Sequence, residues 1–531
     1  MLGKEVCLFS RPLKEHPLFS VAWFYPNSYA VGMAGLGYQL VWRLLEEDRQ
    51  VLVRRGFTDA AEAGIEASEL LGFTLSWELD IFNIMSIVGK QGVKLLSCDR
   101  VQGDALVFGG GPVLTANPEP YADFFDVILL GDAEAVVPAF LNQWKQARML
   151  PSRQEQLESL ATISGVYVPS LYSYKTMDST GPIQAIQATE PAPSFVGKPL
   201  YMPPPEYVAH SVILTSDTTW GDMFLAEIVR SCPQECRFCL ASYLTRPFRH
   251  VNVDAVIEAI TLALPYTKRI GLLGPSVTEH PYFDEIAARL QEHTDIDISI
   301  ASIRADTISD TVLSMLKTLG QRSVTIAIES GSQRLRDSMK KNLTEQEILN
   351  AVALIDKWGF ESVKFYLIAG LPEEEQADLE ETVRLMLLLK KKHRKVRFVA
   401  GISSFVPKAQ TPYQWHGRQK DCGKRIEFLR KNLAPAGIEV RPESHNWSDI
   451  QALLSRGDRR LTKVLLEVAQ SDGKLGSWKK ALKEYASAVP SLEYYAFRQI
   501  PYDEVLPWHH LTQAGRTDYL QKHSLAAAMP K

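Results

Sequence analysis

The sequence predicts an α/β protein with a doubly wound, Rossmann-like N-terminal domain, a central partial TIM-type (β/α)6 barrel and a mostly helical C-terminal accessory domain. Two alternations of short apolar runs with helical patterns, separated by a proline-rich stretch, lead to this prediction. The length agrees with it, because 531 residues correspond to about three or four domains. The expected parts are the Rossmann-like domain 1–175, a linker 176–206, the barrel 207–420 and the C-terminal domain 421–531.

The N-terminal domain is expected to contain a parallel sheet of βαβ units. Its apolar runs, separated by helical patterns, predict strands at 21–25, 51–54, 71–75, 105–108 and 127–130. Glycine-rich turns follow the last two strands, and doubly wound sheets bind ligands at the carboxyl ends of their strands. The residues of interest in these turns are Gly109, Gly110, Gly111, Gly131 and Glu134.

Residues 176–206 lose this periodicity and are rich in proline, which favours extended chain and lacks a backbone donor. We interpret the stretch as an interdomain linker. After it, strands are expected at 223–230, 269–274, 296–303, 323–328, 362–369 and 397–405. Six strand–helix steps of the same kind favour a partial barrel over a second open sheet. From about residue 420 the pattern is mostly helical with charged faces.

The composition excludes several classes of protein. With 46% hydrophobic and 23% charged residues, the chain is neither disordered, collagen-like nor a coiled coil. No run approaches the roughly 18 to 20 apolar residues that cross a bilayer, so we expect a cytoplasmic protein with no membrane partner. The 58 basic and 62 acidic residues give a net charge of −4, which argues against nucleic acid as a partner.

Three of the six cysteines lie within eight residues and directly follow the first predicted barrel strand: Cys232, Cys236 and Cys239, with CxxxCxxC spacing. Three thiolates on one such loop can ligate three irons of a 4Fe-4S cluster and leave the fourth iron without a protein ligand. The alternative is a structural zinc site or buried thiols. Zinc normally takes four ligands, and His250, the nearest candidate, is not placed as in a standard knuckle.

With Phe238 before the last cysteine, the motif resembles that of the radical S-adenosylmethionine (SAM) superfamily. The resemblance implies that the open iron binds the amino and carboxylate groups of SAM. One electron, from a donor such as ferredoxin or flavodoxin, then cleaves SAM to methionine and a 5′-deoxyadenosyl radical, which abstracts hydrogen from a small-molecule or unknown substrate. The protein's own task is to position these groups and to exclude competing reactions.

The resemblance also implies contacts to SAM at the ends of later strands. A carboxylate can accept from ribose hydroxyls or the ammonium group, an arginine can pair with the carboxylate of SAM, and a glycine lets backbone approach the adenine. The expected contacts are Phe238, Ser302, Arg304, Glu329, Ser330, Gly331 and Gly370. An ion pair between Arg304 and Glu329, and a simple loop turn at Gly370, are the alternatives.

The N-terminal domain resembles that of the cobalamin-binding subgroup of this superfamily, which also has a GGP-like loop followed by an acidic glycine turn. This implies cobalamin contacts at Gly109, Gly110, Gly111, Gly131 and Glu134. The D-x-H-x-x-G signature of the axial histidine is absent, and the only histidine before the linker is His16. A cobalamin site without a histidine ligand and a domain kept as scaffold or substrate cover therefore both stay open.

The leading hypothesis is a radical SAM enzyme with one 4Fe-4S cluster, using cobalamin for methyl transfer or a rearrangement. The alternatives are a non-catalytic iron–sulfur or redox-sensing protein and a cobalamin-independent radical SAM enzyme. Methylthiotransferases carry three further N-terminal cysteines for a second cluster, and here only Cys7 and Cys98 are available. One cluster is therefore all that the chain can hold, and no catalytic residue is assigned beyond its ligands.

Overall fold

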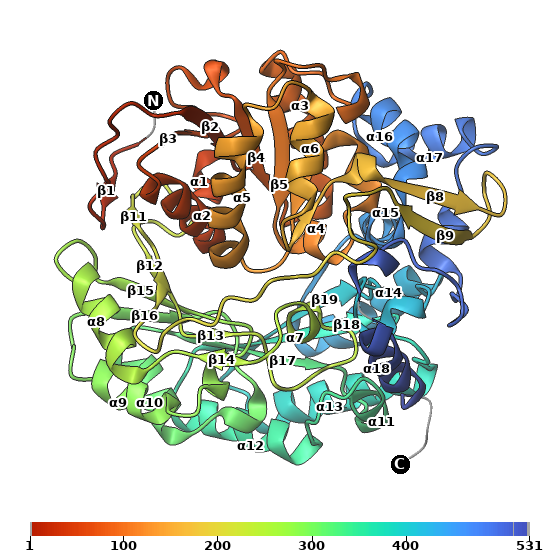
Figure 1. Cartoon of the computed structure of the whole chain (residues 1–531). Helices are drawn as coiled ribbons and strands as arrows, with labels where there is room; N and C mark the ends of the chain where they lie inside the picture. Colours follow the sequence, from red (N-terminus) through yellow and green to blue (C-terminus); the bar gives the residue numbers. More distant parts are fainter. Residues whose placement is uncertain (1–2, 513, 528–531) are drawn as a thin grey trace.

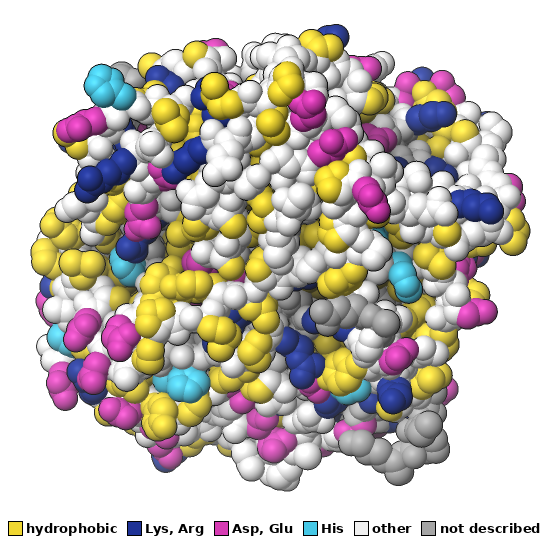
Figure 2. Space-filling model, viewed as in Figure 1, with side chains coloured by type: hydrophobic (Ala, Val, Ile, Leu, Met, Phe, Trp, Pro, Cys, Tyr) yellow, Lys and Arg dark blue, Asp and Glu magenta, His cyan; other side chains and the backbone are white. Residues whose placement is uncertain are grey.

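The computed structural model describes residues 3–512 and 514–527. Two α/β parts face each other, and the C-terminal helices, blue in Figure 1, lie at one side against both of them. Acidic and basic side chains are interspersed over the face shown in Figure 2, in keeping with the small net charge. Within the described ranges no helix has the length and apolar character needed to span a membrane.

The N-terminal part has one sheet in the order β3-β2-β4-β5-β6-β7. The five expected strands are present as β2 (Phe19–Phe24), β3 (Val51–Gly56), β4 (Leu70–Thr74), β5 (Leu106–Gly110) and β6 (Val127–Leu129). These five are parallel, and β7 (Val166–Tyr167) adds an antiparallel edge. The order of the parallel strands is that of flavodoxin-like sheets, in which ligands bind where the order reverses, here between β2 and β4.

Helices cover both faces of this sheet, as in other doubly wound folds (Figure 1). They are α1 (Tyr29–Gly32), α2 (Leu36–Glu47), α3 (Ile81–Lys90), α4 (Pro112–Ala116), α5 (Ala133–Ala147) and α6 (Arg153–Ala161). The strands are buried on both sides, which explains why they appear in the sequence as continuous apolar runs. Helix α2 packs its aromatic residues on the sheet, and Tyr38 stacks on Trp23 with ring centroids 5.8 Å apart.

The stretch expected to be a linker differs from that prediction in two ways. It contains a strand, β9 (Ile183–Ala188), which forms an antiparallel hairpin with β8 (Tyr172–Thr176). The flanking prolines conceal this strand in the sequence. Residues 189–206 form no helix or strand, but they pack on the N-terminal part: Val196 is buried, and the Pro199 carbonyl accepts a hydrogen bond of 3.0 Å from the Asp132 amide.

The barrel sheet consists of two hydrogen-bonded segments joined by a parallel bridge between Ile303 and Ile326. The first contains β12 (Phe224–Glu227), β15 (Arg269–Leu273) and β16 (Asp297–Ile300), with β10 (Ala209–His210) antiparallel at its edge. The second contains β17 (Ser323–Glu329), β18 (Ser362–Ala369), β19 (Arg397–Ser404) and β20 (Glu439–Pro442).

The sheet therefore has seven parallel strands where six were expected, since β20 pairs in parallel with β19. Barrel architecture thus continues beyond residue 420, through α14 (Cys422–Leu433) and β20. Charged residues and a proline at such an edge strand discourage pairing with other chains. They also remove the apolar run by which a strand is recognised in the sequence.

The other barrel helices are α7 (Leu240–Leu244), α8 (Val253–Ala263), α9 (Phe283–Leu290), α10 (Asp310–Thr318), α11 (Gln333–Ser338), α12 (Glu345–Lys357) and α13 (Gln376–Lys392).

The remaining helices are α15 (His445–Arg456), α16 (Thr462–Ala469), α17 (Leu475–Glu484) and α18 (Ala514–Leu525). Their buried residues, among them Leu453 and Trp478, belong to one hydrophobic core with the N-terminal sheet, as does Trp508 in the segment before α18, while the barrel has a core of its own. Phe82 meets Trp478 edge to face at 5.7 Å. The C-terminal helices therefore complete the hydrophobic core of the N-terminal part.

Candidate active site

The three clustered cysteines lie on the loop 231–239, between β13 (Val229–Arg230) and α7. Two residues of this loop have positive φ, Ser231 at 69° and Glu235 at 55°. Non-glycine residues rarely adopt this conformation, and it concentrates at functional sites. Burial raises the pKa of both Cys232 and Cys236, and the nearby Cys239 thiol raises them further.

The surroundings of Cys236 set burial against nearby positive charge. Burial raises the pKa of Cys236 to about 12, and the nearby charges of Lys341 and Arg304 oppose that rise, so they favour a thiolate. Among the described residues, no three Cys, His, Asp or Glu side chains converge on a single metal ion. An iron–sulfur cluster does not need that convergence, because each thiolate binds its own iron.

The back of the cysteine loop is held by an ion-pair network around Glu235. Lys340 Nζ and an Arg246 guanidinium nitrogen each lie 2.6 Å from its carboxylate. The Tyr519 hydroxyl of α18 donates a third contact, also of 2.6 Å. Burial opposes the charged form, but these donors lower the pKa of Glu235 to about 2. Helix α18 thus fixes the cysteine loop, a role that the sequence alone does not indicate.

Two expected SAM contacts, Arg304 and Glu329, lie near enough to Cys236 to shift its pKa. They do not pair with each other. Glu329, at a φ of 62°, lies 2.9 Å from Lys341 Nζ, and both side chains are buried. Arg304 instead pairs with Asp306 at 2.7 Å and with Glu279 at 3.3 Å. Lys341 is a charged neighbour of the cysteines that sequence reasoning missed.

The other expected SAM contacts have protein partners of their own. Ser330 Oγ accepts from the Ser332 amide at 3.1 Å, and the Gly331 amide donates to Thr382 Oγ1 of α13 at 2.9 Å. A side chain at Gly331 would collide with Thr382, so this glycine is needed for helix packing. Phe238 packs on a small apolar cluster at the barrel mouth, and Ser302 is half-buried. Their contacts to SAM stay predictions.

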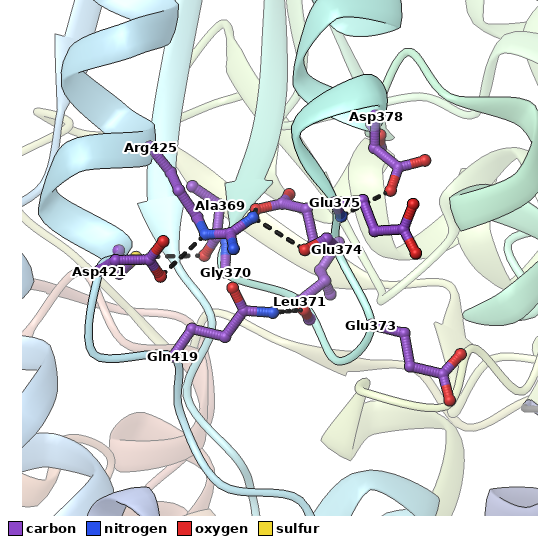
Figure 3. Close-up of polar contacts among 12 residues, drawn as sticks. Ala369, Gly370, Leu371, Glu373, Glu374, Glu375, Asp378, Gln419, Asp421 and Arg425 are labelled. Atoms are coloured by element: carbon purple, nitrogen blue, oxygen red, sulfur yellow. Dashed lines mark hydrogen bonds and ion pairs between the residues drawn. The ribbon is translucent and has the colours of Figure 1, made fainter.

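Gly370 forms the turn after β18 with a φ of 77° (Figure 3). Its amide donates to Glu374 Oε2 at 2.8 Å, and Arg425 Nη1 lies 3.2 Å from the same oxygen. A Cβ at Gly370 would lie 3.1 Å from Cys422 Sγ. Burial raises the pKa of Glu374 to about 7, against these two donors.

We expect Glu374→Gln to flatten the pH dependence of stability. The folded-state pKa, about 7, exceeds the ordinary 4.5. The folded chain therefore keeps a proton that the unfolded chain has lost, and stability falls as pH rises between these values and then levels off. The variant lacks this fall, which is on the order of 2 kcal/mol. Urea denaturation at pH 5.5 and pH 8 measures it. Glu427→Gln, at a half-exposed position, is the control, and a Glu374→Gln slope equal to that of the wild type contradicts the assignment.

A cavity of about 620 Å³, here called the large cavity, lies between the carboxyl edge of the N-terminal sheet and the barrel. It is lined by the ends of β2, β4, β5 and β6, by the start of α2, and by barrel residues that include Ser231, Leu240 and Leu244. Four of the five expected cobalamin contacts line it, namely Gly110, Gly111, Gly131 and Glu134. Gly109 does not, because it packs in the core, where a Cβ would lie 2.6 Å from the Phe125 ring.

One end of the large cavity is charged, and ion pairs there connect the N-terminal part with the barrel. Arg230 pairs with Glu134 at 2.8 Å and with Glu227 at 2.6 Å, and Arg249 pairs with Asp132 at 2.6 Å. Burial raises the pKa of Glu227. The rest of the wall is mostly apolar and aromatic and includes Trp23, Tyr25 and Tyr38, which suits a large ligand with polar arms.

A parallel barrel whose first strand leads into a strained three-cysteine loop, flanked by buried charges, has the features of an enzyme built around an iron–sulfur cluster. Residues 226–386 match the family model described as "Radical SAM superfamily", and residues 56–169 match "Radical SAM proteins, N-terminal". Over 448 residues the chain is 30% identical to an uncharacterised protein of Methanocaldococcus jannaschii, covering 84% of this chain and 90% of that one. The chain belongs to the radical SAM superfamily.

Two further proteins extend the comparison. An uncharacterised methyltransferase of Pyrococcus horikoshii is 25% identical over 296 residues, covering 54% of this chain and 58% of that protein. The solved structure of the radical SAM methyltransferase TsrM of Kitasatospora setae, with cobalamin and a [4Fe-4S] cluster bound, superposes with a TM-score of 0.53 at 11% identity, covering 88% of this chain and 99% of that one. This likeness shows a shared fold. The protein is thus a radical SAM enzyme, with a 4Fe-4S cluster and SAM as cofactors.

Proposed function

We propose that Cys232, Cys236 and Cys239 hold the cluster, that cobalamin occupies the large cavity, and that the enzyme transfers a methyl group to a small organic substrate. The observation that carries the proposal is the position of the large cavity. It reaches from the glycine-lined edge of the N-terminal sheet to Leu240, which directly follows the third cysteine. A ligand there contacts both halves of the enzyme.

The lining suits a corrin, a broad ring with an apolar face and amide arms. A Cβ at Gly37 would meet nothing within 4 Å, so this wall leaves room for a flat ligand. The charged end around Arg230 offers partners for the amide arms. Histidine is absent from the described residues that line the cavity, so the protein would supply no imidazole ligand to cobalt. Bound cobalamin would supply methyl-carrying chemistry, and the similarity to a methyltransferase of Pyrococcus horikoshii supports methyl transfer over rearrangement.

Two of the expected SAM contacts are part of this proposal. Arg304 and Glu329 lie beside Cys236 and would hold the carboxylate and the ammonium or ribose of SAM. The electron would come from a one-electron donor such as ferredoxin or flavodoxin. The fold relative TsrM has been solved with cobalamin bound, which supports a cobalamin site in this chain.

Cofactor content tests the proposal. The protein is produced with hydroxocobalamin in the medium, purified without oxygen, reconstituted with iron and sulfide, and desalted. We expect about four irons and about one cobalt per chain, with the absorption bands of cobalamin. A full iron content without cobalt would instead identify a cobalamin-independent radical SAM enzyme, and zinc in place of iron would remove the cluster assignment.

A further inference from the structure

A second cavity of about 240 Å³, here called the small cavity, lies where the N-terminal part, the barrel and α15 meet. It shares Ser76, Pro112 and Leu240 with the large cavity, so the two adjoin. Leu240 follows Cys239 directly in the chain. The small cavity therefore lies beside both proposed cofactor sites.

One wall of the small cavity holds a partly buried ion pair between Glu78 and Lys408, whose side chains are 6% and 23% exposed. Gln451 Nε2 donates to Glu78 Oε2 at 3.0 Å, and Ser455 Oγ donates to Glu78 Oε1 at 3.1 Å. Burial opposes the charged carboxylate, yet Lys408 keeps the pKa of Glu78 below its ordinary value. This ion pair borders the open space of the small cavity.

The rest of the wall is mainly apolar, from Pro112, Val113, Ala116, Leu240, Ala409 and Leu454, with Trp77 half-exposed. A ligand with a single charge would pair with Glu78 or Lys408 and leave the other buried charge without compensation, which is costly. A ligand that carries both charges compensates both. The cavity is also smaller than the roughly 300–1,000 Å³ usual for drug-sized ligands.

We infer that the small cavity binds a free zwitterionic amino acid with an apolar side chain, as the substrate of the proposed methyl transfer. The ammonium group pairs with Glu78 and with Gln451 Oε1, which accepts no hydrogen bond from the described residues, and the carboxylate pairs with Lys408. The side chain then extends along the apolar wall toward Leu240. Binding of the amino acid is inferred from this geometry alone. Its role as the substrate rests on the proposed function.

Calorimetric titration of the anaerobically purified full chain tests the inference. The probes are L-leucine, L-phenylalanine and L-tryptophan, each compared with the matching amine that lacks the carboxylate and the matching acid that lacks the ammonium group. At least one amino acid should bind, and both of its analogues should bind about tenfold more weakly or worse, because each loses a charged pair. Failure of all three amino acids, or analogues that bind equally well, overturns the inference.

Variants test the same point within the protein. Glu78→Gln and Lys408→Met should each weaken amino-acid binding about tenfold or more. Lys357→Met, in the exposed ion pair with Asp310, is the matched control and should bind like the wild type. Equal affinity in all three variants overturns the inference, and the analogue series decides it if a variant does not fold. Cobalt is measured on the same samples, so binding without cobalamin contradicts only the proposed function.

Discussion

Cys236→Ala is expected to abolish reductive cleavage of SAM and to lower the iron content well below the about four irons per chain of a complete cluster. Cys236 is the most buried of the three clustered cysteines, and the neighbouring Lys341 and Arg304 favour its thiolate. Without it only two thiolates remain to hold the cluster. The measurement is 5′-deoxyadenosine formed by the reduced protein in the presence of SAM.

Cys422→Ala is the control for this variant. Cys422 is also buried, but its sulfur lies 3.4 Å from both the Ala369 carbonyl oxygen and Ser404 Oγ, beneath the Gly370 turn. Its removal deletes one sulfur atom from packing and leaves the cysteine loop intact. We expect SAM cleavage and iron content like those of the wild type. Equal loss of 5′-deoxyadenosine in both variants would show that the ligands are assigned wrongly.

Gly37→Leu is expected to remove cobalamin from the protein while SAM cleavage persists. Gly37 is the second residue of α2 and lines the large cavity, and a Cβ there meets nothing within 4 Å. A leucine therefore fills space that the ligand needs. Folding should not suffer, because glycine in a helix is roughly 1 kcal/mol less favourable than alanine and leucine is a good helix former. Cobalt per chain and the melting temperature are the measurements.

The matched control is Gly476→Leu. Gly476 is the second residue of α17, also follows a leucine, and has nothing within 4 Å of its Cβ position. This variant should keep about one cobalt per chain, and Gly37→Ala should retain most of it. If Gly37→Leu keeps its cobalamin, or if both leucine variants lose it equally, the ligand does not occupy this cavity.

The sequence predicts the strands well where they are buried on both faces. β2 and β6 are nearly continuous apolar runs, as parallel strands are. It fails for β20, whose Glu439 and Arg441 are exposed, and for β9, which lies between prolines. No local pattern shows that Trp478 packs with Phe82, because residues almost four hundred positions apart meet only in the folded chain.

The residues of the candidate sites also fall into those that the sequence predicts and those that it does not. The cysteine spacing and the glycine turns could be predicted, because these residues follow one another in the chain. Glu78, Lys408 and Gln451 could not, because each is an ordinary polar residue in its own segment and only folding brings them together. Gly109 shows the opposite error: its place in a glycine turn suggests ligand contact, whereas it is required for packing against Phe125.

The shared core of the N-terminal sheet and the C-terminal helices has a consequence for synthesis of the chain. Domains generally fold from the N-terminus onward as the ribosome releases them. Here the first sheet must wait for Leu453, Trp478 and Trp508, while the barrel, with a separate core, is complete some residues earlier. The barrel can therefore form before the N-terminal part is complete. The small cavity, which residues of α15 line, is complete only when the C-terminal helices have packed on the first strands.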